Sequence, residues 1–156
     1  MKIQWKKLIA CLAIPLVVGG VSSLLTGESM ETFQSLNKPP LAPPGWLFPV
    51  VWTILFVLMG IASYLVFTAG KDRLTTRAAL TVYGIQLAVN FFWPVIFFNL
   101  GAYLFAFLWL ILLWVLILAT AILFYQLSKP AAWLLIPYLI WVTFAGYLNF
   151  GVFILN

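Results

Sequence analysis

The chain has 156 residues, of which 65% are hydrophobic and 7% are charged, and its formal net charge at pH 7 is +5. A water-soluble domain of this size does not stay in solution with so few charges, so the composition predicts an integral membrane protein. A separate soluble domain is excluded, because the apolar stretches take up nearly the whole chain and leave one domain, residues 1–156.

Five apolar stretches are long enough to cross a bilayer as helices, since the hydrocarbon core needs about 20 apolar residues per helix. In chain order they are residues 8–26, 47–69, 76–98, 102–126 and 132–154. The predicted fold class is therefore an all-α integral membrane protein, a bundle of five transmembrane helices. A β-barrel does not fit, because its strands alternate apolar with polar residues and residues 108–118 do not.

The first span also has the pattern of a cleavable signal peptide, and residues 8–11 have that of a lipoprotein box. Almost no hydrophobic core precedes Cys11, and removal of the span would leave four helices, so we expect the span to be retained. A single cysteine excludes an intramolecular disulfide and a cysteine-based metal site.

The long connection between the first two spans, residues 27–46, is rich in proline and ends in aromatic residues. Proline fixes φ, so this segment is stiff compared with an ordinary loop. We expect it to form a shaped lid over a pocket buried in the membrane.

Polar residues inside the third and fifth spans are candidates for that pocket. Gln86 and Asn90 are four residues apart on one helical face, and Trp93 follows on the same broad face. The fifth span adds, at spacings of three or four, Trp141, Phe144, Ala145 and Leu148, and its polar residues are Thr143 and Asn149. Together they could line a flat aromatic pocket. Ordinary interhelical hydrogen bonds, worth about 1 kcal/mol each, explain the polar residues equally well.

Two pairs of small residues would let helices approach closely: Gly19 with Ser23, and Gly84 with Ala88. The second pair is a candidate face for a homodimer, and packing within the monomer is the alternative use of either pair. Pro137 lies inside the fifth span, where it either kinks the helix and widens a cavity or is tolerated by neighbouring helices.

Basic residues are distributed unevenly between the two ends of the spans. One side carries Lys2, Lys6, Lys7, Lys71, Arg73, Arg77 and Lys129, and the other carries only Lys38. The positive-inside rule places the first side in the cytoplasm and the Pro-rich loop outside, and we expect a bacterial cytoplasmic membrane. A nucleic acid is not an expected partner, because no basic groove is recognisable.

The chain has no histidine, and its three acidic residues, Glu28, Glu31 and Asp72, all lie outside the spans. These facts exclude a histidine-ligated haem, a zinc site, a carboxylate dyad and a Ser-His-Asp triad. They also disfavour proton-driven transport, which uses intramembrane Asp, Glu or His. We expect no metal site and no required cofactor.

Five separated sequence blocks resemble the TspO/translocator protein family, also known as tryptophan-rich sensory proteins or peripheral benzodiazepine receptors. The blocks are Leu36-Asn37-Lys38-Pro39-Pro40, Pro43-Pro44-Gly45-Trp46, Val51-Trp52-Thr53, Gln86-Leu87-Ala88-Val89-Asn90 with Trp93 and Phe97-Phe98, and Pro137-Tyr138-Leu139-Ile140-Trp141 with Phe144-Ala145 and Leu148-Asn149. They occur in the family's order across residues 30–150. The loop departs from the family pattern at Leu41 and at Thr32-Phe33, and the sterol motif of animal members is not reproduced.

The resemblance implies a five-helix bundle, often dimeric, whose cavity opens toward the first loop and binds porphyrins, sterols and flat compounds of the isoquinoline or benzodiazepine type. The ligand-binding residues that it implies are Trp52, Asn90, Trp93, Trp141, Ala145 and Leu148. Helical spacing adds Gln86 and Phe144 to the predicted ligand-binding residues. The residues that it implies for the lid are Pro39, Pro43, Pro44 and Trp46.

Three functions follow from the resemblance. The first is a sensor that binds a porphyrin in the membrane, favouring the metal-free ring because the chain has no histidine. The second is light-dependent breakdown of porphyrin, for which Trp52 and Trp141 would be the redox-active residues. The third is transport of a tetrapyrrole or another lipophile, which the lack of repeat halves and of a coupling group argues against.

Overall fold

The computed structural model describes residues 2–156, and within them it contains helices and no strand. Five helical segments are long and apolar enough to cross a membrane. They are α1 (Trp5–Thr26), α3 (Leu47–Phe67), α4 (Arg73–Pro94) with the π-helical turn η2 (Val95–Asn99), α5 (Tyr103–Leu127), and α6 (Lys129–Leu134) followed by α7 (Ile136–Leu155). The predicted fold class, an all-α bundle of five membrane-spanning helices, is confirmed.

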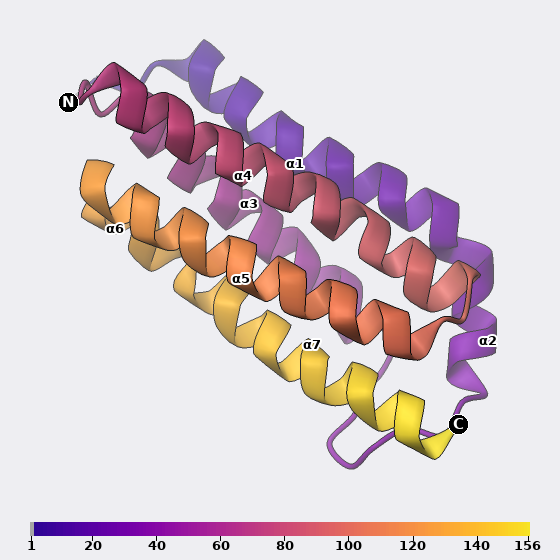
Figure 1. Ribbon diagram of the computed structural model, residues 1–156. Helices are drawn as coiled ribbons and strands as arrows, with labels where there is room; N and C mark the ends of the chain where they lie inside the picture. The colour runs from indigo at the N-terminus through magenta and orange to yellow at the C-terminus, as the bar shows by residue number, and fades with distance from the viewer. Residues whose placement is uncertain (1) are drawn as a thin grey trace.

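The helices lie roughly alongside one another and form one bundle (Figure 1). In it α4 packs against α5, α5 against α7, and α1 against α3 and α4. The N-terminus and α6 lie at one end, whereas α2 (Met30–Gln34) and the C-terminus lie at the other (Figure 1). We call the second end the lid end, because residues 27–46 run across it.

The buried face of α5 shows how a helix is positioned when both of its sides are apolar. Its buried residues recur at helical spacing: Ala106, Leu110, Leu113, Ile117, Thr120, Ala121, Phe124 and Leu127. Its other face exposes large apolar side chains such as Leu108, Val115 and Ile122. In water such a surface would promote aggregation, but in a bilayer it faces acyl chains at no cost.

Helix boundaries follow local chemistry. Asp72 caps α4: its carboxylate accepts hydrogen bonds from the Thr75 backbone N–H at 3.0 Å and from the Thr75 hydroxyl at 2.7 Å. The fifth span is interrupted at Leu135, and Pro137 therefore lies in the first turn of α7. In that position its missing N–H has no intrahelical partner to lose, so Pro137 begins a helix instead of kinking one.

Glycines set the approach of α1 to α3. A Cβ added to Gly60 would lie 2.8 Å from the Cα of Leu12, and one added to Gly19 would lie 2.2 Å from the Phe56 ring. A side chain larger than hydrogen therefore has no space at either glycine. Gly19 serves packing within the monomer, whereas Gly84 and Ala88 are exposed on the outer surface of α4.

The loop at the lid end is anchored to α7. The Asn156 side chain accepts a hydrogen bond from the Asn37 N–H at 3.2 Å and donates one to the Asn37 carbonyl at 2.8 Å. The Tyr147 hydroxyl donates to the Pro40 carbonyl at 2.6 Å. Pro39 is buried against Gly151, where an added Cβ would lie 2.5 Å from its ring. The loop therefore stands closed over the end of the bundle.

Candidate functional site

A cavity of about 430 Å³ lies inside the bundle at the lid end. Its walls come from α1, α3, α4 with η2, and α7, and its end is covered by Phe33 of α2 and Gly45 of the loop. The volume falls within the range of about 300–1,000 Å³ that is usual for small-molecule sites.

Aromatic rings make up much of the cavity wall. They are Phe33, Phe48, Trp52, Phe56, Trp93, Phe97, Phe98 and Trp141. Several are held by one another: Trp93 stacks on Phe97 with ring centroids 5.1 Å apart, and Phe33 meets Phe98 edge-on at 5.4 Å. Rings that support each other keep fixed orientations, so the wall presents flat faces and edges in place of a flexible aliphatic lining.

A chain of buried hydrogen bonds fixes the polar part of the wall. The Asn90 amide donates to the Tyr138 hydroxyl at 2.6 Å, and that hydroxyl donates to the Gln86 carbonyl oxygen at 2.7 Å. Tyr138 and Gln86 are each 1% exposed, whereas Asn90 lines the cavity. Gln86 therefore acts behind the wall, where it orients Tyr138 and through it Asn90.

A second pair joins α4 to α7 at the cavity wall. The Trp93 indole N–H donates to the Asn149 side-chain oxygen at 3.1 Å, and the Asn149 amide donates to the Tyr103 carbonyl at 2.9 Å. Both ends of the Asn149 side chain are thus used. The Trp93 ring is locked in position, so it offers the cavity its face and not its N–H group.

The indole nitrogen of Trp141 is buried and, within the part of the chain that the structure describes, has no hydrogen-bond partner. Its ring lines the cavity and meets Phe48 edge-on, with centroids 6.0 Å apart. An unpaired buried donor costs about 1–3 kcal/mol. A hydrogen-bond acceptor on a bound molecule would recover that energy.

The sequence comparisons agree with this architecture. The family model of TspO/MBR matches residues 11–155. The chain belongs to the TspO/MBR family. It is 40% identical to the tryptophan-rich protein TspO of Chlorobaculum tepidum over 157 residues, which cover 100% of this chain and 99% of the relative.

Two other relatives of the TspO/MBR family come from distant sources. The tryptophan-rich sensory protein of Cereibacter sphaeroides is 35% identical over 156 residues, covering 100% of this chain and 95% of the relative. The translocator protein of Bos taurus is 36% identical over 148 residues, covering 94% of this chain and 88% of the relative. The resemblance inferred from the five sequence blocks is thus confirmed.

The structure brings most of the predicted site residues of this TspO/MBR chain to one cavity. The predicted residues that line it are Trp52, Asn90, Trp93, Trp141, Ala145 and Leu148. Gln86 and Phe144 do not line it: Gln86 lies behind Asn90, and Phe144 packs between Trp141 and Tyr147. Polar Thr143 lies outside as well, exposed on the outer surface of α7.

The predicted lid residues lie over or beside the site without lining it. Pro39 packs on Gly151, Pro43 is half-buried, and Pro44 and Trp46 are exposed. Leu41 is 81% exposed and has a φ of 72°, a conformation that costs an ordinary residue energy and that suits a tight reversal of the loop.

Sequence reasoning missed the wall contributed by α1. Its lining residues are Leu16, Gly19, Gly20, Ser22, Ser23 and Thr26, and Gly27 lines the cavity directly after the helix ends. The signal was present, since this end of α1 is rich in glycine and hydroxyl residues. Two of the hydroxyls have partners in the protein: Ser22 donates to the Phe91 carbonyl of α4 at 2.9 Å, and Thr26 donates to the Ser22 carbonyl of its own helix at 3.0 Å.

Among the residues that the structure describes, no charged side chain lines the cavity, and no group of His, Cys, Asp or Glu could hold a metal ion. The site can therefore stack, enclose and hydrogen-bond a neutral molecule. It offers no side chain for general acid-base chemistry at neutral pH.

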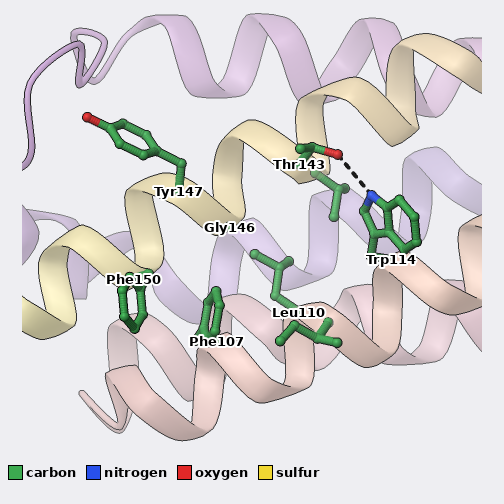
Figure 2. Close-up of a pocket in the computed structure, with 9 residues that line it drawn as sticks. Phe107, Leu110, Trp114, Thr143, Gly146, Tyr147 and Phe150 are labelled. Carbon is green, nitrogen blue, oxygen red and sulfur yellow. Dashed lines mark hydrogen bonds between the residues drawn. The ribbon is translucent and has the colours of Figure 1, made fainter.

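A second, shallower hollow of about 320 Å³ lies outside the bundle, between α5 and α7. Figure 2 shows Phe107, Leu110 and Trp114 of α5 on one side and Thr143 and Gly146 of α7 on the other. The Trp114 indole donates to the Thr143 hydroxyl at 2.9 Å. With its polar groups paired, this hollow is an ordinary surface for lipid chains.

Proposed function

We propose that this chain is a membrane-embedded binding protein and sensor for porphyrins and similar flat hydrophobic molecules. The observation that carries the proposal is the cavity of about 430 Å³ with eight aromatic rings in its wall. Offset and edge-on contacts between such rings and a flat conjugated ligand contribute about 0.5–1.5 kcal/mol each beyond area burial.

The absence of charge from the described wall constrains the ligand. A carboxylate buried there would have no counter-ion, and its desolvation would oppose binding. The conjugated body of a porphyrin would therefore occupy the cavity, and its carboxylates would lie at an opening. Asn90 and the unpaired N–H of Trp141 supply the directional polar contacts. A metal-free ring is favoured, because the chain has no histidine for axial ligation.

Uncharged aromatic compounds of the isoquinoline or benzodiazepine type suit the same wall for the same reasons. The distribution of basic residues supports an orientation with the α6 end in the cytoplasm and the lid end outside, in a bacterial cytoplasmic membrane. The exposed Gly84 and Ala88 supply a flat strip on α4 for a homodimer.

The test is a titration of the purified chain with protoporphyrin IX in the dark, followed by tryptophan quenching. We expect saturable binding with one site per chain. Ala145→Phe places a ring in the cavity and should abolish binding, whereas Ala78→Phe, on the exposed surface of α4, should leave it unchanged. Absence of saturation, or equal effects of the two changes, would refute the proposal.

Illumination of the same samples separates binding from the alternative, light-dependent breakdown of porphyrin. A sensor leaves the porphyrin absorbance as stable as in the Ala145→Phe control. Loss of porphyrin that disappears in Trp52→Phe or Trp141→Phe, with binding retained, would assign the chain a photochemical activity. Trp133→Phe, at an exposed tryptophan of α6, is the matched control.

A further inference from the structure

The cavity is closed at the lid end but open at its side. The loop is held to α7 through Asn37, Pro40 and Pro39, as described above. The end of α1 is tied to η2, because the Asn99 amide donates to the Leu25 carbonyl at 3.0 Å and its oxygen accepts from the Ser29 hydroxyl. These contacts close two of the routes by which a molecule could reach the aromatic wall.

The remaining route into the cavity is the gap between α1 and α3. Gly60 and Gly19 bring the two helices into close contact. Nearer the lid end, residues of both helices line the cavity. Among the described residues, no heavy atom lies within 4 Å of a Cβ added to Gly20. The lining residues Gly20 and Ser23 of α1, and Pro49 and Thr53 of α3, are exposed. Exposed lining residues that lie on two adjacent helices indicate an opening between those helices.

The opening lies within the depth of the hydrocarbon. At a helical rise of about 1.5 Å per residue, Gly20 lies about 9 Å and Ser23 about 5 Å from the end of α1 at Thr26. Exposed apolar side chains flank it on both helices, among them Val21 (42%), Val50 (48%) and Ile54 (55%). Acyl chains, and not water, therefore surround it.

The rim is chemically suited to hydrocarbon. The Thr53 hydroxyl donates to the Pro49 carbonyl of its own helix at 2.7 Å, which leaves its methyl group for the surroundings. No charged residue occurs in α3 at all. The rim is built largely of glycine, serine, threonine and proline, so a flat molecule can pass without displacing a large side chain.

We propose that the gap between Gly20-Ser23 and Pro49-Thr53 is a lateral portal through which uncharged, flat lipophiles enter the cavity directly from the bilayer. The inference rests on the proposed binding function and adds the route and the class of molecule admitted. A lipophile already dissolved in the membrane needs no opening of the lid, and a charged one is delayed by the apolar rim.

The experiment blocks the portal with a reversible adduct in the chain reconstituted in lipid vesicles. In a Cys11→Ala background, Ser23→Cys is labelled with benzyl methanethiosulfonate, and Ile122→Cys on the outer face of α5 is the matched control. The probe is the uncharged dimethyl ester of protoporphyrin IX, followed by tryptophan quenching in the dark. Because the protein folds before it is labelled, a reductant must restore the original rates.

We expect the Ser23→Cys adduct to slow association of the probe about tenfold. When the adduct is formed after loading, it should slow dissociation of the probe by the same factor. The affinity should therefore change little. The Ile122→Cys adduct should change neither rate. Tyr147→Phe removes one of the contacts that hold the lid to α7. It should leave both rates within about twofold, whereas entry under the lid would accelerate both.

The outcomes separate the portal from the binding function. The portal alone would be overturned if binding were saturable but the association and dissociation rates were unchanged by the Ser23→Cys adduct. Rates that rise in Tyr147→Phe would overturn it as well. An adduct that weakens binding without slowing dissociation would also overturn it, since it would then be a competitor inside the cavity. No saturable binding by the unlabelled chain would overturn the binding function itself.

Discussion

Removal of a single oxygen atom, in Tyr138→Phe, tests whether the buried hydrogen-bond chain organises the cavity wall. The Tyr138 hydroxyl accepts from Asn90 and donates to Gln86, at 2.6 and 2.7 Å, and the residue is 1% exposed. Water cannot replace the lost hydroxyl without repacking. The change therefore deprives two buried amides of a partner while removing no hydrophobic contact.

The magnitude follows from two interhelical bonds in a membrane protein, each worth about 0.6 kcal/mol on average and about 1.7 kcal/mol at most. We expect Tyr138→Phe to lower the free energy of unfolding by about 1–3 kcal/mol, measured by reversible unfolding in mixed detergent micelles. We also expect weaker porphyrin binding, because Asn90 loses the group that orients its amide.

The matched control is Tyr125→Phe, which removes the hydroxyl of a tyrosine that is 48% exposed on α5 and should leave stability unchanged. The double variant Gln86→Leu/Tyr138→Phe completes a cycle and should be less destabilised than the sum of the single changes, since the two residues are coupled. A loss for Tyr138→Phe no greater than that for Tyr125→Phe would refute the reasoning.

Three further predictions concern other parts of the structure. Gly60→Ala places a Cβ 2.8 Å from the Leu12 backbone and should cost about 1–3 kcal/mol of unfolding free energy, whereas Gly20→Ala, in open space, should be neutral or stabilising; thermal unfolding checks both. Trp93→Phe keeps a ring but removes the donor to Asn149, so it should weaken porphyrin binding several-fold with little change in the helical content seen by circular dichroism. Hydrogen bonds from the Thr75 side chain and backbone hold the pKa of Asp72 below its ordinary value of 3.8. The ionised cap therefore stabilises the chain above pH 3.8, and this stabilisation should be lost as the pH falls below that value. A titration of stability against pH checks this, and Asp72→Ala, which has no cap at any pH, should not show the loss.

Sequence reasoning predicted the spans from hydropathy alone, and the helix ends lie within a few residues of the expected positions: α1 begins at Trp5 instead of residue 8, and α4 at Arg73 instead of residue 76. The early start of α4 has a local cause, because the Asp72 cap extends the helix into polar sequence that hydropathy assigns to a loop. The interruption at Leu135 was not predicted, since it lies inside a continuous apolar run.

The cavity wall was only partly predictable for a related reason. Periodicity identifies one face of a helix, and it gave Asn90 and Trp93 correctly as neighbours on α4. Periodicity cannot show which residues of that face reach the cavity. Gln86, one turn from Asn90, is buried behind Tyr138 and does not line it. The walls from Phe33 and α1 come from packing between elements distant in sequence, so periodicity does not predict them, although glycine and hydroxyl residues mark this end of α1.

The cavity results from opposite packing on the two sides of α3. On one side, glycines bring α1 so close that an added Cβ at Gly60 would meet the backbone of Leu12. On the other, large rings span the distance to α7: Trp52 meets Tyr138 at 6.2 Å and Phe48 meets Trp141 at 6.0 Å between centroids. In water the hydrophobic effect would favour collapse around such rings, but in a bilayer lipid competes equally for their surfaces. Packing alone then sets the spacing of these helices, and rings too large to interdigitate leave a space that another flat, apolar molecule fits.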